Sequence, residues 1–217
     1  MVGSQVGDTS PCVVGSISNG SLFVRILGTS LLERRATVTL AAATVIVGAS
    51  IVSDGDVARA LNGLAGVTWF ASSAMFVMEG RKRGATPLQW AGLVALTAAV
   101  AFVIKPTDLP LATAGFAPAG FLAGFAMRRD AVFWAKLIPA LYLPMHIGTA
   151  ILKAAGRSAL GLESTIRTEP PPTAAIVPAV MLAAAMAGGW AASRVLLRRV
   201  RGASDERARL ASEAEMG

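Results

Sequence analysis

The stretch from Lys105 to Lys153, KPTDLPLATAGFAPAGFLAGFAMRRDAVFWAKLIPALYLPMHIGTAILK, decides the fold of this chain. It holds two apolar runs, 109–127 and 131–152, and each is close to the ~20 residues that a membrane-spanning helix needs. The polar residues 128–130 between the runs are too few to form anything but a turn at a membrane surface. The stretch therefore predicts two antiparallel transmembrane helices.

The composition of the whole chain points to the same class of protein. The 217 residues are 54% hydrophobic and 15% charged, whereas soluble domains average ~45–50% apolar and ~25% charged residues. We therefore expect an all-α polytopic membrane protein, a bundle of about six transmembrane helices that forms one membrane domain over residues 36–201. Its apolar runs lie at about 36–52, 61–78, 88–104, 109–127, 131–152 and 173–193.

Both ends of the chain are expected to lie outside this domain. Residues 1–20 are rich in Gly and Ser without periodicity, so we expect a disordered tail. Residues 21–35 mix apolar side chains with arginines, which is typical of a short helix lying on a membrane surface. Residues 202–217 form a charged, alanine-rich cytoplasmic tail that is either solvated or in contact with a partner.

Basic residues gather in alternate loops of the predicted bundle. Twelve of the arginines and lysines near the spans lie on the side of the N-terminus, and five lie on the opposite side. By the positive-inside rule, both termini then face the cytoplasm. The net charge of +7 is explained by this topology and by anionic lipid headgroups rather than by nucleic acid. Arginine outnumbers lysine sixteen to four, which favours a high-GC bacterial genome and a location in the bacterial plasma (inner) membrane.

Small residues recur at helical spacing in three of the runs. Lipid gives helices no hydrophobic reason to associate, so small residues that allow close approach of two backbones mark packing faces. We expect these Gly/Ala seams to hold the bundle together, to support self-association, or to contact a larger membrane complex. They comprise Thr37, Ala41, Thr44 and Gly48 in the first run, Thr113, Ala117, Gly120 and Gly124 in the fourth, and Ala184, Gly188 and Ala192 in the sixth.

The run at 131–152 is the least lipid-like, because it contains two prolines and several polar residues. Proline in a membrane helix frees backbone carbonyl groups, and these need other partners. A polar stripe on such a helix usually faces protein or a water-filled cavity. The candidate ligand-binding residues are those of the stripe and of the preceding outer loop: Tyr142, His146, Thr149, Lys153, Lys105 and Asp108.

Two interpretations of His146 remain open. It is either a contact for a solute or a proton, since histidine changes charge near physiological pH, or a structural residue hydrogen-bonded to a backbone carbonyl group or to Tyr142. For Lys136 we expect a structural role, with the side chain extending to the inner headgroups, because it lies only six residues beyond Asp130.

Several kinds of chemistry lack support in the sequence. One histidine and one cysteine, Cys12, cannot form a metal site or a disulfide framework within one chain. Paired carboxylates at membrane depth, a nucleophile elbow and a phosphate loop are absent from the sequence. We therefore predict no catalytic residues, no metal and no cofactor.

Three function classes remain. The first, which we favour, is a small-solute binding or transport component with an outward-facing site, because a polar stripe in a helix broken by two prolines is costly for a plain scaffold. The second is an accessory or structural subunit of a larger membrane complex. The third is a membrane enzyme acting on lipid-linked substrates, with basic residues of the outer loops holding phosphate.

Overall fold

A computed structural model describes residues 30–104, 109–128, 130–159 and 172–216, and it contains only helices over these ranges. In chain order they are α2 (Leu31–Ile51), α3 (Gly55–Lys82), α4 (Pro87–Val103), α5 (Leu109–Met127), α6 (Ala131–Ala159), the 3-10 helix η1 (Pro172–Ile176) and α7 (Val177–Met216). Each of the six predicted apolar runs corresponds to one of the six α-helices. The predicted disordered tail at 1–20 lies outside the described residues.

Five of these helices are long and apolar enough to cross a membrane, and the described chain is therefore a multi-pass membrane protein by its helix composition. The sixth, α4, is apolar but only 17 residues long. α2 begins at Leu31, so it includes the charged residues 33–35 that the sequence assigned to a separate surface helix. α3 is also longer than predicted, with 28 residues that extend to Lys82.

Local sequence signals explain where two of the helices begin. The Ser30 hydroxyl accepts a hydrogen bond from the Glu33 amide at 3.0 Å, which caps the N-terminus of α2. α4 begins with a capping box, in which Thr86 and Gln89 satisfy each other's backbone amides, and it carries Pro87 in its first turn.

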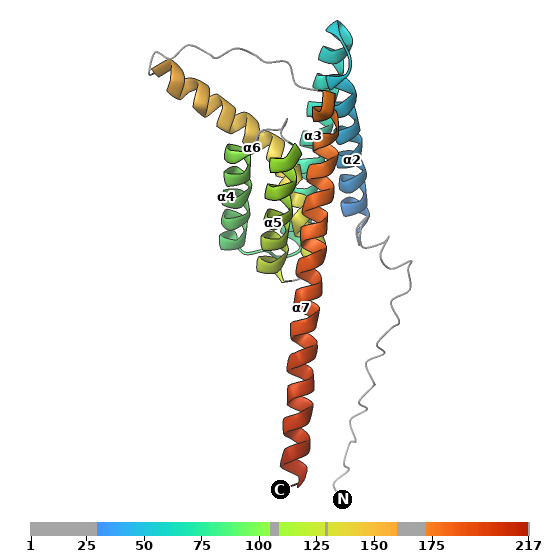
Figure 1. The fold of residues 1–217 in the computed structure, drawn as a ribbon, viewed down its shortest axis with the longest axis vertical. Coiled ribbons are helices and arrows are strands. Elements are labelled where there is room, and N and C mark those ends of the chain that lie inside the picture. The colour runs from blue at the N-terminus through green and yellow to red at the C-terminus, as the bar shows by residue number, and fades with distance from the viewer. Residues whose placement is uncertain (1–29, 105–108, 129, 160–171, 217) are drawn as a thin grey trace, which may run out of the picture.

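α6 is the central helix of the bundle. It contacts α3, α4, α5 and α7, and it touches α2 as well. Almost every residue from Ala131 to Tyr142 is buried. Toward its C-terminal end the helix leans away from its neighbours (Figure 1), and Ile151 and Leu152 are exposed there. α6 therefore has a buried first half and a second half that leaves the bundle.

α5 and α7 pack closely through the glycines that the sequence singled out. A Cβ atom added at Gly188 of α7 would collide with the backbone of α5 at Ala117 and Phe121, and one added at Gly120 would collide with the backbone of Ala185. A Cβ atom at Gly124 would lie 2.9 Å from Ala131 of α6 and 3.2 Å from the Ala192 side chain of α7. The predicted seams of the fourth and sixth runs are therefore confirmed at these glycines, whose contacts lie within the chain, whereas Thr113 of the fourth seam is exposed.

The predicted seam of the first run is only partly right. Thr37 and Thr44 are buried, as expected for one packed face, and Gly48 lies against the backbone of Ala175. Ala41 is exposed instead. The buried face of α2 is centred on Ala36 and its helical neighbours, because the contacts with α3 fall on that side.

The basic segments meet at one end of the bundle. Arg83, after the last turn of α3, pairs with Glu33 at the start of α2 and with Asp130 before α6. Gly189 of α7 lies against the first turn of α6, so the arginines that follow it belong to the same end. From there α7 continues alone beyond the other helices to the C-terminal end (Figure 1).

Candidate functional site

Lys136 is buried at the centre of the basic end of the bundle. Its side chain has no exposed surface, and its Nζ atom lies 2.8 Å from Oε1 of Glu33 and 3.3 Å from the Thr37 hydroxyl. Glu33 is itself only 2% exposed. The ion pair therefore joins the first turn of α2 to the second turn of α6, although its two residues are 103 positions apart in the sequence.

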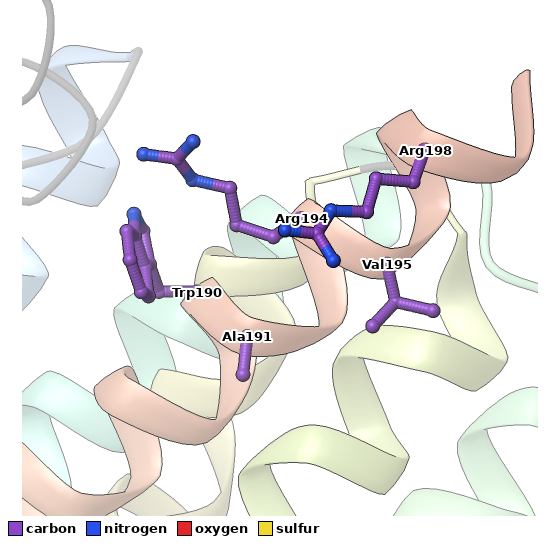
Figure 2. A pocket seen from close by; sticks show the side chains of 5 residues that line it. All are labelled: Trp190, Ala191, Arg194, Val195 and Arg198. Carbon is purple, nitrogen blue, oxygen red and sulfur yellow. The ribbon is translucent and has the colours of Figure 1, made fainter. Parts of the chain in front are cut away.

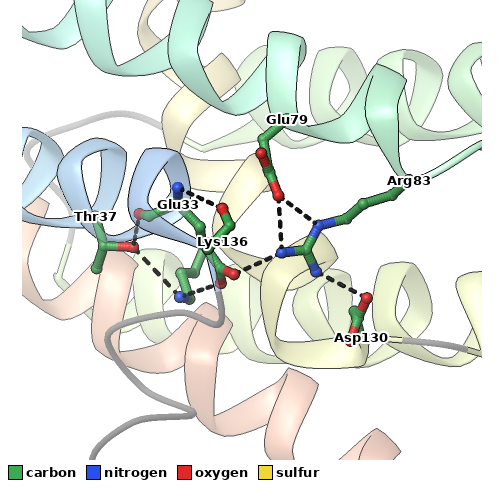
Figure 3. A network of polar contacts seen from close by, with 7 residues as sticks. Glu33, Thr37, Glu79, Arg83, Asp130 and Lys136 are labelled. Atoms are coloured by element: carbon green, nitrogen blue, oxygen red, sulfur yellow. Dashed lines mark hydrogen bonds and ion pairs between the residues drawn. The ribbon is translucent and has the colours of Figure 1, made fainter.

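Arg83 extends this pair into a cluster of five charged residues (Figure 3). Its guanidinium lies 2.7 Å from Oε2 of Glu33, 3.3 Å from Oε1 of Glu79 and 2.8 Å from Oδ2 of Asp130. We call Glu33, Glu79, Arg83, Asp130 and Lys136 the ion-pair cluster. Since guanidinium carries five donors in a fixed plane, one arginine can hold three carboxylates at once.

An aromatic ring and a tight turn hold Arg83 in this position. The guanidinium lies over the ring of Phe133, 3.9 Å from the ring centroid, and this favours the cation electrostatically. Asp130 adopts a left-handed backbone conformation with φ of 54° in the turn between α5 and α6. Asp and Asn tolerate this conformation better than most residues, and the turn places the Asp130 carboxylate toward α3.

The structure corrects the expectation for Lys136. We expected its side chain to reach the inner headgroups, but it points into the bundle, because Glu33 supplies a buried carboxylate at the same depth. Sequence reasoning missed Glu33 and Arg83 as functional candidates by assigning them to a surface helix and a basic loop. The signal that could have predicted the pair of Glu33 and Lys136 is an acidic residue at the start of one span and a lysine in the second turn of another.

Of the predicted ligand-binding residues, the structure brings Tyr142 and His146 together. Their rings stack with centroids 5.4 Å apart. The buried Tyr142 hydroxyl donates to the carbonyl oxygen of Ile104 at 2.8 Å, and Nδ1 of His146 lies 3.4 Å from the carbonyl oxygen of Ala101. Both rings therefore serve the C-terminal end of α4, whose last carbonyl groups have no partner within the helix.

The remaining predicted ligand-binding residues cannot be placed around this pair. Thr149 and Lys153 belong to the second half of α6, and their side chains fall outside the described part of the molecule. Lys105 and Asp108 lie in the connection between α4 and α5, outside the described residues, as does the expected helix cap at Asp108.

Side chains of α3 donate hydrogen bonds to a carbonyl group that a proline of α6 leaves without a partner in its own helix. Pro144 has no N–H, so the Ala140 carbonyl group loses its partner in the helix. The Ser73 hydroxyl donates to this oxygen at 2.5 Å and the Trp69 indole N–H donates to it at 3.0 Å. The same indole lies 3.2 Å from the Pro139 oxygen. α3 thereby supports the bend of α6 between the ion-pair cluster and the Tyr142–His146 pair.

The polar groups of the described residues are well satisfied. No buried side-chain nitrogen or oxygen atom in this part of the chain lacks a hydrogen-bond partner. Over the same residues, no group of three or more His, Cys, Asp or Glu side chains is arranged to hold a metal ion. The ion-pair cluster therefore links α2, α3 and α6 through charged groups that all have partners.

Comparisons of this chain with models of protein families, with curated proteins and with solved structures found no match.

Proposed function

We propose that the chain crosses the bacterial plasma membrane six times, with both termini in the cytoplasm. α4 would be the short span, since 17 residues at ~1.5 Å per residue cover about 25 Å, close to the ~30 Å hydrocarbon core. The gathering of the basic segments at one end of the bundle supports this orientation, because cytoplasmic ends carry most of the lysine and arginine.

Within this topology we infer that the protein binds or transports a small solute through a site that opens to the outside. The site is proposed at the outer half of α6, with Tyr142 and His146 as its inner wall and Thr149, Lys153, Lys105 and Asp108 as further contacts. Two features support it: α6 leaves the bundle toward its C-terminal end, and the His146 ring is only partly buried. A partly exposed ring beside a buried hydroxyl suits recognition of a small polar solute.

The ion-pair cluster is the observation that carries this proposal. Charged groups within a membrane bundle are costly, and they commonly belong to solute or ion pathways. A buried ion pair adds little stability compared with apolar packing, so stability alone is a poor reason to keep Lys136 and Glu33. Transporters close one side of the membrane while the other side is open. The cluster is suited to be the inner seal, because it joins α2, α3 and α6 through contacts that can break and re-form.

Purification in mild detergent followed by mass spectrometry of the released small molecules tests the proposal. The retained solute is measured per mole of folded protein in the wild type and in His146→Gln, His146→Ala and Tyr142→Phe. We expect retention to fall in all three variants, while the folded fraction stays close to that of the wild type in His146→Gln. Thr113→Val is the matched control, since Thr113 is exposed and bonds only within its own helix turn at 3.1 Å.

Two results would contradict this function. The first is the absence of any retained small molecule in the wild type. The second is retention that follows the amount of folded protein across all the variants, which would make the Tyr142–His146 pair purely a cap for α4.

A second candidate, an accessory subunit of a larger membrane complex, is favoured by the free end of α7. This 40-residue helix continues alone past the bundle, and its residues from 197 onward that are described are exposed. Truncation after Arg201 separates the two candidates. An accessory subunit would lose a stoichiometric protein partner on truncation, whereas a solute-binding protein would keep its small molecule.

A further inference from the structure

A groove lies on the exposed side of α7, at the point where the apolar part of this helix ends. It has a volume of about 380 Å³ and is lined by Trp190, Ala191, Arg194, Val195 and Arg198 (Figure 2). Trp190, Arg194 and Arg198 follow one another at intervals of four residues, so they lie on one face of the helix. Ala191 and Val195 lie beside this row and form the apolar floor of the groove.

The arginines of this groove have no acidic partner among the described residues, because no ion pair there involves Arg194 or Arg198. The Arg194 guanidinium lies over the Trp190 ring, 4.7 Å from its centroid. This contact orients one guanidinium toward the groove while leaving its donors available. Two such groups on neighbouring turns can share one phosphate, which each can bind with two parallel hydrogen bonds.

The depth of the groove matches the boundary between hydrocarbon and headgroups. Gly189, next to Trp190, lies against Ala131 and Ala135 in the first turns of α6. Trp190 is therefore level with the turn that ends the α5 and α6 spans. Tryptophan is enriched at this level of a membrane, where its ring is apolar and its N–H meets water.

We propose that Trp190, Arg194 and Arg198 form a binding site for the phosphate headgroup of an anionic glycerophospholipid. The lipid phosphate would lie between the two guanidinium groups, with its acyl chains along Ala191 and Val195 toward the bundle. A free phosphate ion would use the arginines but not the apolar floor, and the floor is why we favour the lipid. The lipid site requires only that the chain is inserted in a membrane. Its test is therefore independent of the test of the proposed solute site.

Native mass spectrometry of the full chain in mild detergent tests the site, after delipidation and titration with phosphatidylglycerol. Each basic side chain near a membrane surface contributes about fivefold in affinity, so Arg194→Gln with Arg198→Gln should weaken binding about 30-fold. The control is Arg201→Gln with Arg207→Gln, which removes the same charge from the same helix outside the groove. It should leave binding within about twofold.

Three further arms make the result decisive. Phosphatidylcholine should bind much more weakly than phosphatidylglycerol, and inorganic phosphate at millimolar concentration should not displace the anionic lipid. Arg194→Lys with Arg198→Lys keeps the charge but loses the paired hydrogen bonds, so it should bind with intermediate affinity, and it replaces the Gln variant if that one fails to fold. Equal weakening in the control pair, equal binding of both lipids, or displacement by inorganic phosphate would overturn the proposal.

Discussion

Replacing Glu33 with Gln is expected to destabilise the protein more than replacing its partner, Lys136, with Met. Glu33→Gln removes the carboxylate that lies 2.8 Å from Lys136 and leaves a cation with 0% exposure in the bundle. Breaking a buried ion pair in this way costs about 3 kcal/mol or more in the free energy of unfolding. Lys136→Met has a milder effect, because Glu33 keeps Arg83 at 2.7 Å.

We expect Lys136→Met to cost about 1–2 kcal/mol, the range for weakening one buried polar contact. The double variant should cost less than the sum of the two single variants by about 1–3 kcal/mol, since the buried Lys136 cation is then removed together with the carboxylate that it pairs with. The asymmetry between the single variants is a property of the cluster geometry, in which Glu33 has two cationic partners.

The assay is denaturant-induced unfolding in mild detergent, followed by circular dichroism. Glu206→Gln on the exposed end of α7 is the matched control, and it should change the free energy of unfolding by less than about 0.5 kcal/mol. A Glu33→Gln variant that loses no more stability than Lys136→Met, or two variants that both behave like the control, would contradict this role of the cluster geometry.

Three other expectations follow from the packing and the topology. Gly188→Ala should lower the free energy of unfolding by about 1–3 kcal/mol, because the new Cβ atom meets the backbone of α5. Gly92 has open space around it, so Gly92→Ala should be neutral or slightly stabilising in the same unfolding assay. Ser73→Ala should lower the free energy of unfolding by about 1 kcal/mol in the wild type. The loss should be smaller in a Pro144→Ala background, because the N–H of residue 144 can then donate to the Ala140 oxygen itself. Equal losses in the two backgrounds of this double-mutant cycle would show that the Ser73 hydrogen bond does not compensate for the proline. Reporter fusions should read as cytoplasmic at positions 84, 130 and 217 and as external at 55, 107 and 161, and a cytoplasmic reading at 161 would remove the six-span topology.

The helices and their close contacts were predictable from the sequence because both depend on local patterns. Apolar run length predicted one helix for each run, and the spacing of small residues predicted the contact of Gly120 and Gly188 with the neighbouring backbone. The first run shows the limit of that pattern. Ala41 fits the spacing and is nevertheless exposed, because the side of α2 that packs is decided by α3 and not by α2 itself.

The ion-pair cluster was not predictable in the same way, because its members are brought together only by tertiary structure. Lys136 alone resembles any lysine near a membrane surface, and Glu33 alone resembles part of a charged surface helix. Their pairing requires the starts of α2 and α6 to lie side by side. The prolines of α6, in contrast, predicted a need for outside hydrogen bonds, and at Pro144 only the identity of the donors in α3 had to come from the structure.

Chemical labelling of a single cysteine at the outer site is the most direct test of an outward-facing site sealed by the ion-pair cluster. The substitution is His146→Cys, at the partly buried position of α6, in a Cys12→Ala background, with a membrane-impermeant maleimide added to whole cells or to inverted membrane vesicles. Labelling is expected from the outer side, and from the cytoplasmic side only when Glu33→Gln is also present. Labelling of the His146→Cys protein from the cytoplasmic side with Glu33 intact, or no labelling from the outer side, would contradict this arrangement.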